Sequence, residues 1–84
     1  MEIRFHPHAL ERMVERGVTE EKVRGTVEKG ERFPAKFGRT GFRRNFQFER
    51  EWRGRRYRIK QVEAYAVLED DTWLVITVIA RYFD

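Results

Sequence analysis

The chain has 84 residues, a formal net charge of +4 and no cysteine. This length predicts one domain with one small core, and the lack of cysteine excludes disulfides and thiolate metal sites. We expect no membrane span, since no apolar stretch approaches about 20 residues, and no signal peptide. These features favour a cytoplasmic, single-domain protein (residues 1–84), and the excess of Arg over Lys with few Asn, Gln and Ser is typical of thermophiles.

The basic residues are concentrated in the middle of the chain. Residues 32–60 contain eleven basic and two acidic side chains, whereas residues 61–84 contain one basic and five acidic side chains. A segment of this charge is typical of proteins that bind a polyanion, so we predict contact with nucleic acid. The alternative is a solvated hairpin whose arginines pair with the acidic ends of the chain.

The pattern of residues 7–16 predicts a short helix, which follows a short edge strand predicted at residues 2–5. Pro7 suits the first helical position, and Gly17 suits the left-handed residue that ends a helix. At about 100° per residue, four apolar side chains share one face and are expected to be buried. They are Ala9, Leu10, Met13 and Val14.

A second stripe of this helix carries His8, Arg12 and Arg16, which are spaced four residues apart. Like charges at this spacing cost a few tenths of a kcal/mol, so we expect a compensating partner outside the helix. That partner is either a carboxylate elsewhere in the fold, such as Glu63, or an anionic ligand. His8 and Arg12 are candidate catalytic residues, with His8 as a general base, and Arg12 and Arg16 are candidate phosphate clamps. In the structural alternative, the same three side chains hold the helix in place.

A second helix is predicted at residues 19–29, with Thr19 as N-cap and Gly30 at its end. Residues 31–41 predict a loop with two aromatic side chains. Phe33 and Phe37 either anchor this loop to the core or offer stacking surfaces.

Three strands are predicted at residues 42–52, 56–68 and 72–83, with a hairpin turn at Arg53-Gly54-Arg55. The apolar phase of the second strand shifts near Gln61, which indicates a bulge or a bend. The last strand is apolar on both faces, so we place it in the centre of the sheet. The expected fold is α+β: a helical hairpin packed on one face of a three- to four-stranded, mainly antiparallel sheet.

The predicted hairpin carries a row of cations. Arg56, Arg58 and Lys60 alternate onto one strand face, where they would follow a phosphate backbone. The alternative is an edge strand whose charges prevent aggregation. The candidate nucleic-acid ligands of the whole chain are Arg16, Arg43, Arg44, Arg53, Arg55, Arg56 and Lys60.

The helix motif His8-x3-Arg12-Met13-x2-Arg16-Gly17-Val18-Thr19, together with Val75-Ile76-Thr77-Val78 in the last strand, resembles the family named "domain of unknown function 4258". The order of elements is similar to that of RelE/ParE-like toxins of toxin–antitoxin systems. This similarity implies an RNA-binding protein, a metal-independent endoribonuclease activity without a cofactor, and an antitoxin partner. The ParE-like branch acts on a topoisomerase, so the similarity leaves the target class open.

Metal-free RNA cleavage needs a base, cations for the developing phosphorane charge and an acid. His8 or Glu63 is the candidate base, Arg58 and Arg81 are the candidate cations, and Tyr82 is the candidate acid. Arg81 and Tyr82 point to opposite faces of one strand, so they serve one site only if the chain end bends. The other functional class is a non-catalytic module whose basic hairpin binds an acidic partner protein. The apolar last strand is compatible with a homodimer.

Overall fold

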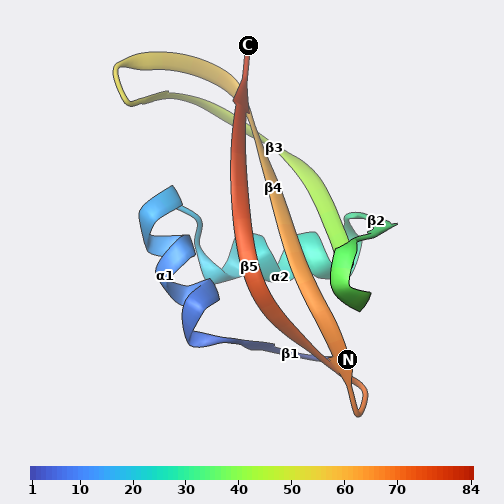
Figure 1. Cartoon of the computed structure of the whole chain (residues 1–84). Coiled ribbons are helices and arrows are strands. Elements are labelled where there is room, and N and C mark those ends of the chain that lie inside the picture. Colours follow the sequence, from blue (N-terminus) through green and yellow to red (C-terminus); the bar gives the residue numbers. More distant parts are fainter.

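The computed structural model describes residues 1–84 and shows helices packed against one twisted sheet (Figure 1). The elements in chain order are β1 (Glu2–Phe5), α1 (Pro7–Arg16), α2 (Glu20–Lys29), β2 (Glu31–Pro34), the short helix η1 (Lys36–Gly38), β3 (Thr40–Trp52), β4 (Arg55–Glu69) and β5 (Thr72–Phe83). The expected α+β class is confirmed. No helix is long and apolar enough to cross a membrane.

The sheet has five strands in the order β1-β5-β4-β3-β2. The expected number was three to four. All neighbours are antiparallel except β1 and β5, which are parallel. β5 is an interior strand, but the central strand is β4. The prediction of a loop throughout 31–41 was wrong, because residues 31–34 form β2 and pair with residues 40–43. The segment Glu-Arg-Phe-Pro has no polar–apolar alternation and ends in proline, so it lacks the signals of a strand.

Local sequence signals set the helix boundaries as expected. Pro7 is the first residue of α1, and Gly17 ends the helix with φ 65°, while its N–H donates to the carbonyls of Met13 and Val14. Thr19 caps α2 by accepting a hydrogen bond of 3.2 Å from the Lys22 N–H. These caps satisfy backbone groups that a helix end otherwise leaves unpaired.

The core lies between the helices and one face of the sheet. Its fully buried side chains include Val23 of α2, Phe42 of β3, Val62 of β4, and Val75 and Val78 of β5. The Phe42 ring meets the Trp73 ring edge to face, with centroids 5.0 Å apart. Hydrophobic burial of these side chains therefore holds both helices against the same face of the sheet.

Only half of the apolar side chains expected in the core from α1 are buried. Ala9 and Met13 are buried, but Leu10 is 44% and Val14 is 84% exposed, so the prediction was wrong for these two. The cause is the position of α1, which packs mainly on β5. A helix that packs on one strand buries only the narrow stripe that faces it.

The β3–β4 hairpin bends over the end of α1 (Figure 1). A bulge between Gln47 and Arg50 interrupts the pairing of the two strands, and Glu49 has φ 50°. Bulges of this kind bend the strand that carries them. The bend brings the Trp52 ring so close to Gly17 that a Cβ there would lie 3.0 Å from it. The bulge expected near Gln61 is instead found between Tyr65 and Ala66, in the pairing of β4 with β5.

The sheet therefore has a covered face, which packs on α1 and α2, and an uncovered face. Successive residues of a strand point to opposite faces. Val62 and Ala64 of β4 belong to the buried core on the covered face. Glu63 lies between them and points to the uncovered face, so adjacent residues of one strand serve different surfaces.

Candidate nucleic-acid interface

A cluster of polar side chains lies on the uncovered face, where β3, β4 and β5 are paired. We call Arg43, Glu63, Tyr65 and Arg81 the uncovered-face cluster. The Tyr65 hydroxyl donates to Glu63 Oε1 at 2.7 Å, and Arg81 Nε donates to Glu63 Oε2 at 2.8 Å. Arg43 lies opposite Glu63 in the strand register and bonds to Glu31 of β2. Glu63 is only 4% exposed because these neighbours cover it.

The cluster holds Glu63 in its charged form. Burial works to raise the pKa of Glu63, but the hydrogen bonds from Tyr65 and Arg81 and the charges of Arg81 and Arg43 outweigh it, so the pKa is below its ordinary value. Burial and the adjacent carboxylate raise the pKa of the Tyr65 phenol. At neutral pH the cluster therefore presents a carboxylate, a protonated phenol and two guanidinium groups.

An aromatic cavity of about 430 Å³ adjoins the cluster. Its walls include Phe33, Phe37 and Tyr65, with Lys36 and Arg39 also lining it. The Phe33 ring lies directly over Gly41, where any Cβ would clash with it, and meets the Tyr65 ring edge to face at 6.0 Å. This geometry leaves room for a flat ring beside three aromatic side chains.

Phe37 is exposed at the edge of this cavity. Its side chain is 86% exposed, and its backbone has φ 61°, which is uncommon for a bulky residue. Of the two alternatives left open for the loop aromatics, anchoring to the core is therefore wrong for Phe37. The stacking alternative fits its position better, since strained residues cluster at ligand sites.

Few of the cations in residues 32–60 have an acidic partner. Only Arg43, Arg55 and Arg58 approach a carboxylate, and Arg58 lies 4.0 Å from Glu49. The other eight have no carboxylate within the 4.0 Å that defines an ion pair: Arg32, Lys36, Arg39, Arg44, Arg50, Arg53, Arg56 and Lys60. The acidic ends of the chain therefore do not neutralise the basic segment, and the solvated-hairpin alternative loses its main support.

Three of these eight cations make other contacts within the fold. Arg44 points to the covered face and donates to the Gly25 carbonyl at 3.3 Å. Lys60 is 4% exposed and donates to the Gly17 carbonyl, so it does not belong to an exposed row with Arg56 and Arg58. Arg32 lies 5.2 Å from the centre of the Trp73 ring. The cations that contact no carboxylate, carbonyl or buried ring are Lys36, Arg39, Arg50, Arg53 and Arg56.

The α1 stripe has a partner inside its own helix. Arg12 Nη1 bonds to both carboxylate oxygens of Glu15 at 3.0 Å, and Arg16 lies 3.9 Å from the same group. The expectation of a partner outside the helix was therefore wrong for Arg12. Glu63 also cannot fill that role, because it lies on the other face of the sheet from α1.

The predicted catalytic residues do not form one site. His8 is exposed on α1, over the covered face, whereas Arg81 belongs to the uncovered-face cluster. The Tyr82 hydroxyl donates to the Arg16 carbonyl at 3.3 Å, and its ring stacks on Trp52 at 5.1 Å. Only Glu63 and Arg81 among the candidates are brought together, and Tyr65 takes the place beside them that Tyr82 was expected to fill.

Tyr65 and the cavity beside it were not found by sequence reasoning. The alternation in β4 places Glu63 and Tyr65 on one face, and that signal was available. The pairing of Tyr65 with Gly41, and of Gly41 with Phe33, joins residues from three strands. Such register is a long-range property, so the cavity has no local signature in the sequence.

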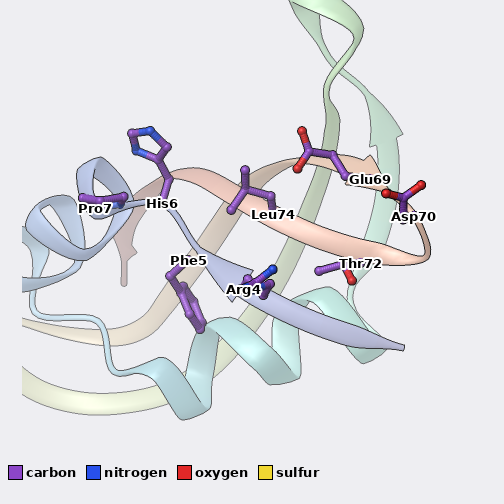
Figure 2. Close-up of a pocket in the computed structure, with 8 residues that line it drawn as sticks. All are labelled: Arg4, Phe5, His6, Pro7, Glu69, Asp70, Thr72 and Leu74. Atoms are coloured by element: carbon purple, nitrogen blue, oxygen red, sulfur yellow. The ribbon is translucent and has the colours of Figure 1, made fainter.

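A separate cleft of about 380 Å³ lies at the end of β1, beside the turn between β4 and β5. Figure 2 shows that its polar side chains diverge: His6 stands at one end, Glu69 and Asp70 at the other, and Leu74 lies between them. His6 also accepts a hydrogen bond from the His8 N–H as the cap of α1. No group of three or more potential metal ligands is present in the chain. We therefore assign no chemistry to this cleft.

A model of one protein family matches residues 5–80, nearly the whole chain. The chain belongs to this family, which is described as "Domain of unknown function (DUF4258)". No curated protein and no solved structure matches the chain. The similarity to RelE/ParE-like toxins, which rests on the order of elements, is not confirmed by these comparisons.

Proposed function

We propose that the protein binds single-stranded RNA along β3 and β4. The observation that carries the proposal is the set of unneutralised cations beside two aromatic rings, the exposed ring of Phe37 and the half-buried ring of Trp52. Lys36 and Arg39 flank Phe37 at one end of β3, and Arg50, Arg53 and Arg56 surround the hairpin at the other end. Cations follow the phosphate backbone, while aromatic faces stack unpaired bases.

Unpaired bases are the ligand that fits the aromatic groups. Arg39 lies 5.8 Å from the centre of the Phe37 ring, and Arg53 lies 5.4 Å from that of Trp52. A duplex hides its base faces, so Phe37 has no surface to stack on in double-stranded nucleic acid. β3 has 13 residues, so at about 3.4 Å per residue the path along this bent strand is roughly 40 Å long. An RNA strand that contacts both ends must lie along the sheet.

Fluorescence anisotropy with a labelled, mixed-sequence RNA oligonucleotide tests this proposal. We expect binding at about 50 mM salt that weakens steeply towards about 200 mM, as counterion release requires. Arg53→Gln and Arg56→Gln should each reduce the magnitude of the salt slope by about 1. If no binding is seen at the lower salt concentration, the proposal is wrong and the acidic-protein alternative takes its place.

Phe37→Ala tests the stacking part separately. Loss of one stacked base should weaken binding by about 1–3 kcal/mol, without a change in salt slope. Leu68→Ala is the matched control, because Leu68 is also an exposed apolar side chain but lies away from the cavity. Equal effects of the two substitutions would exclude a base-stacking role for Phe37.

Metal-independent RNA cleavage is a second candidate function, which the uncovered-face cluster favours. Glu63 is held as a carboxylate that can accept a proton from a ribose 2′-hydroxyl. Arg81 can neutralise the developing phosphorane charge, and the Tyr65 phenol, whose pKa is raised, can donate a proton to the leaving 5′-oxygen. The products would be a 2′,3′-cyclic phosphate and a 5′-hydroxyl end.

The cleavage test is incubation with RNA in the presence of a chelator, followed by analysis of the product ends. We expect cyclic-phosphate ends from the native protein and none from Arg81→Gln, whose side chain lies at the surface of the cluster. Arg24→Gln is the matched control, because Arg24 also pairs with a glutamate but lies on α2. Cleavage that persists in Arg81→Gln would remove this cluster from consideration as the active site.

A further inference from the structure

A second cavity, of about 350 Å³, lies between the bent β3–β4 hairpin and the link from α1 to α2. We call it the hairpin pocket. Three cations line it: Lys22 of α2, Arg50 of β3 and Lys60 of β4. The rings of Phe48 and Trp52 also line it. The hairpin pocket is on the covered face and is therefore distinct from the uncovered-face cluster.

The three cations have no anionic partner in the fold. Lys60 donates to a neutral carbonyl, that of Gly17, and Lys22 lies 4.6 Å from the centre of the Phe46 ring. Arg50 makes no ion pair. Glu51 is the single acidic side chain that lines the pocket, and it forms no ion pair with any of the three.

This arrangement is unfavourable without an anion. Burial lowers the pKa of Lys60, and the nearby charges of Lys22 and Arg50 lower it further. Like charges that converge on one cavity repel one another, and a bound dianion would reverse the sign of that interaction. A fold gains nothing in stability from this convergence, whereas an anion-binding site requires it.

We propose that the hairpin pocket binds a phosphate monoester, with Lys22, Arg50 and Lys60 as its ligands. Ammonium and guanidinium groups form short, charge-assisted hydrogen bonds to phosphate oxygens. The Phe48 and Trp52 rings supply a flat wall for the organic part of the ligand. The monoester is carried either by a mononucleotide or by the 5′ end of an RNA strand. The hairpin pocket shares Arg50 and Trp52 with the proposed RNA-binding surface along β3 and β4, but the inference does not rest on RNA binding.

The first experiment uses inorganic phosphate and then AMP as probes, at constant ionic strength, with amide and indole NMR signals as the readout. We expect saturable shifts at Gly17, Thr19 and the Trp52 indole, and no shift at the Trp73 indole, which is buried elsewhere in the core. The proposal is overturned if neither phosphate nor AMP causes saturable shifts at about 10 mM. This concentration is about ten times a weak, millimolar dissociation constant.

The variants are Lys22→Gln and Arg50→Gln, neither of which removes a hydrogen bond of the fold. Each should weaken AMP binding by about fivefold or more, as expected for one charge-assisted hydrogen bond. Arg56→Gln is the matched control, because it removes one hairpin charge outside the pocket. If Arg56→Gln weakens AMP binding as much as Arg50→Gln, binding follows overall charge and the assigned site is wrong.

A 5′-phosphorylated and a 5′-hydroxyl RNA oligonucleotide distinguish the two sources of the monoester. Preference for the phosphorylated strand, lost in Arg50→Gln, identifies the RNA end as the ligand. Equal binding of the two strands, together with saturable AMP binding, identifies a mononucleotide. RNA binding can fail while the AMP shifts persist, so the failure of one proposal is separable from failure of the other.

Discussion

Lys60 and Glu63 are the two buried charges of β4, and they lie on opposite faces of the sheet in opposite surroundings. Glu63 receives hydrogen bonds from Tyr65 and Arg81, so its negative charge is balanced. Lys60 meets one carbonyl oxygen, and the charges that act on it are positive. The difference shows that the uncovered-face cluster is electrostatically complete, whereas the hairpin pocket is not.

The pKa of both residues is lowered, but the consequence for the stability of the charged form is opposite in the two. For Glu63 a lowered pKa means that the folded protein favours the charged form. For Lys60 it means that the folded protein disfavours the charged form. One charge therefore stabilises the fold at neutral pH and the other costs stability there.

The largest expected effect on the free energy of unfolding is that of Glu63→Gln. It removes the charge that two donors share and should reduce the free energy of unfolding by about 1–3 kcal/mol, the cost typical of lost charge-assisted hydrogen bonds. Urea unfolding at neutral pH measures the change. Glu69→Gln is the control, because Glu69 is exposed and forms no ion pair. Equal effects of the two substitutions would mean that the cluster adds no stability.

A smaller effect is expected from pH. The Glu63 pKa is lowered in the folded protein relative to an ordinary value of 4.5, so its stabilising contribution is fully present above that value. The contribution is lost as the pH falls through the folded pKa. The difference between native protein and Glu63→Gln in urea midpoint should therefore narrow as the pH is lowered from 7 towards about 2.5. If the difference in urea midpoint stays constant over this pH range, the conclusion that Tyr65 and Arg81 stabilise the charged form of Glu63 is wrong.

The smallest effect is expected from Lys60→Met. The substitution loses the hydrogen bond from the charged Lys60 to the Gly17 carbonyl, worth about 1.5–3 kcal/mol, but also removes a charge that the fold disfavours. The two effects oppose each other, so the net change in unfolding free energy at pH 7 should be within about 1 kcal/mol. Lys29→Met, on the exposed end of α2, is the control.

The pH dependence of stability at alkaline pH also tests whether the fold disfavours the charge of Lys60. The folded pKa of Lys60 is below its ordinary value of 10.5, so stability due to Lys60 rises as pH increases between the two values. Lys60→Met should remove that rise, while Lys22, Arg50 and Tyr82 remain around the site. A Lys60→Met variant as unstable as Glu63→Gln would show that Lys60 is a structural cation with no need of an anion.

Features that depend on neighbouring residues were predicted well from the sequence. Pro7, Gly17 and Thr19 set helix ends through caps that reach at most four residues. The turn at Arg53 and Gly54 was also predicted, and both residues have positive φ, 51° and 84°. These signals are local, so one sequence contains them in full.

Features that depend on register and docking were not predicted. Leu10 and Val14 have the spacing of a core face, but their burial depends on what lies beside α1. Lys60 continues the alternation of Arg56 and Arg58, yet the bend of the hairpin places it against Gly17. Glu63 and Arg81 were candidates for one cleavage step, but only the pairing of β4 with β5 brings them into contact.

The parallel pairing of β1 with β5 joins Glu2 to Thr72, almost the whole length of the chain. α1 likewise packs on β5, so Ala9 and Met13 have no surface to bury against until residues 72–83 have been synthesised. Contacts at such sequence separation make folding slow relative to a helical bundle of equal size. During synthesis, α1 therefore cannot bury its apolar side against the sheet until residues 72–83 have left the ribosome.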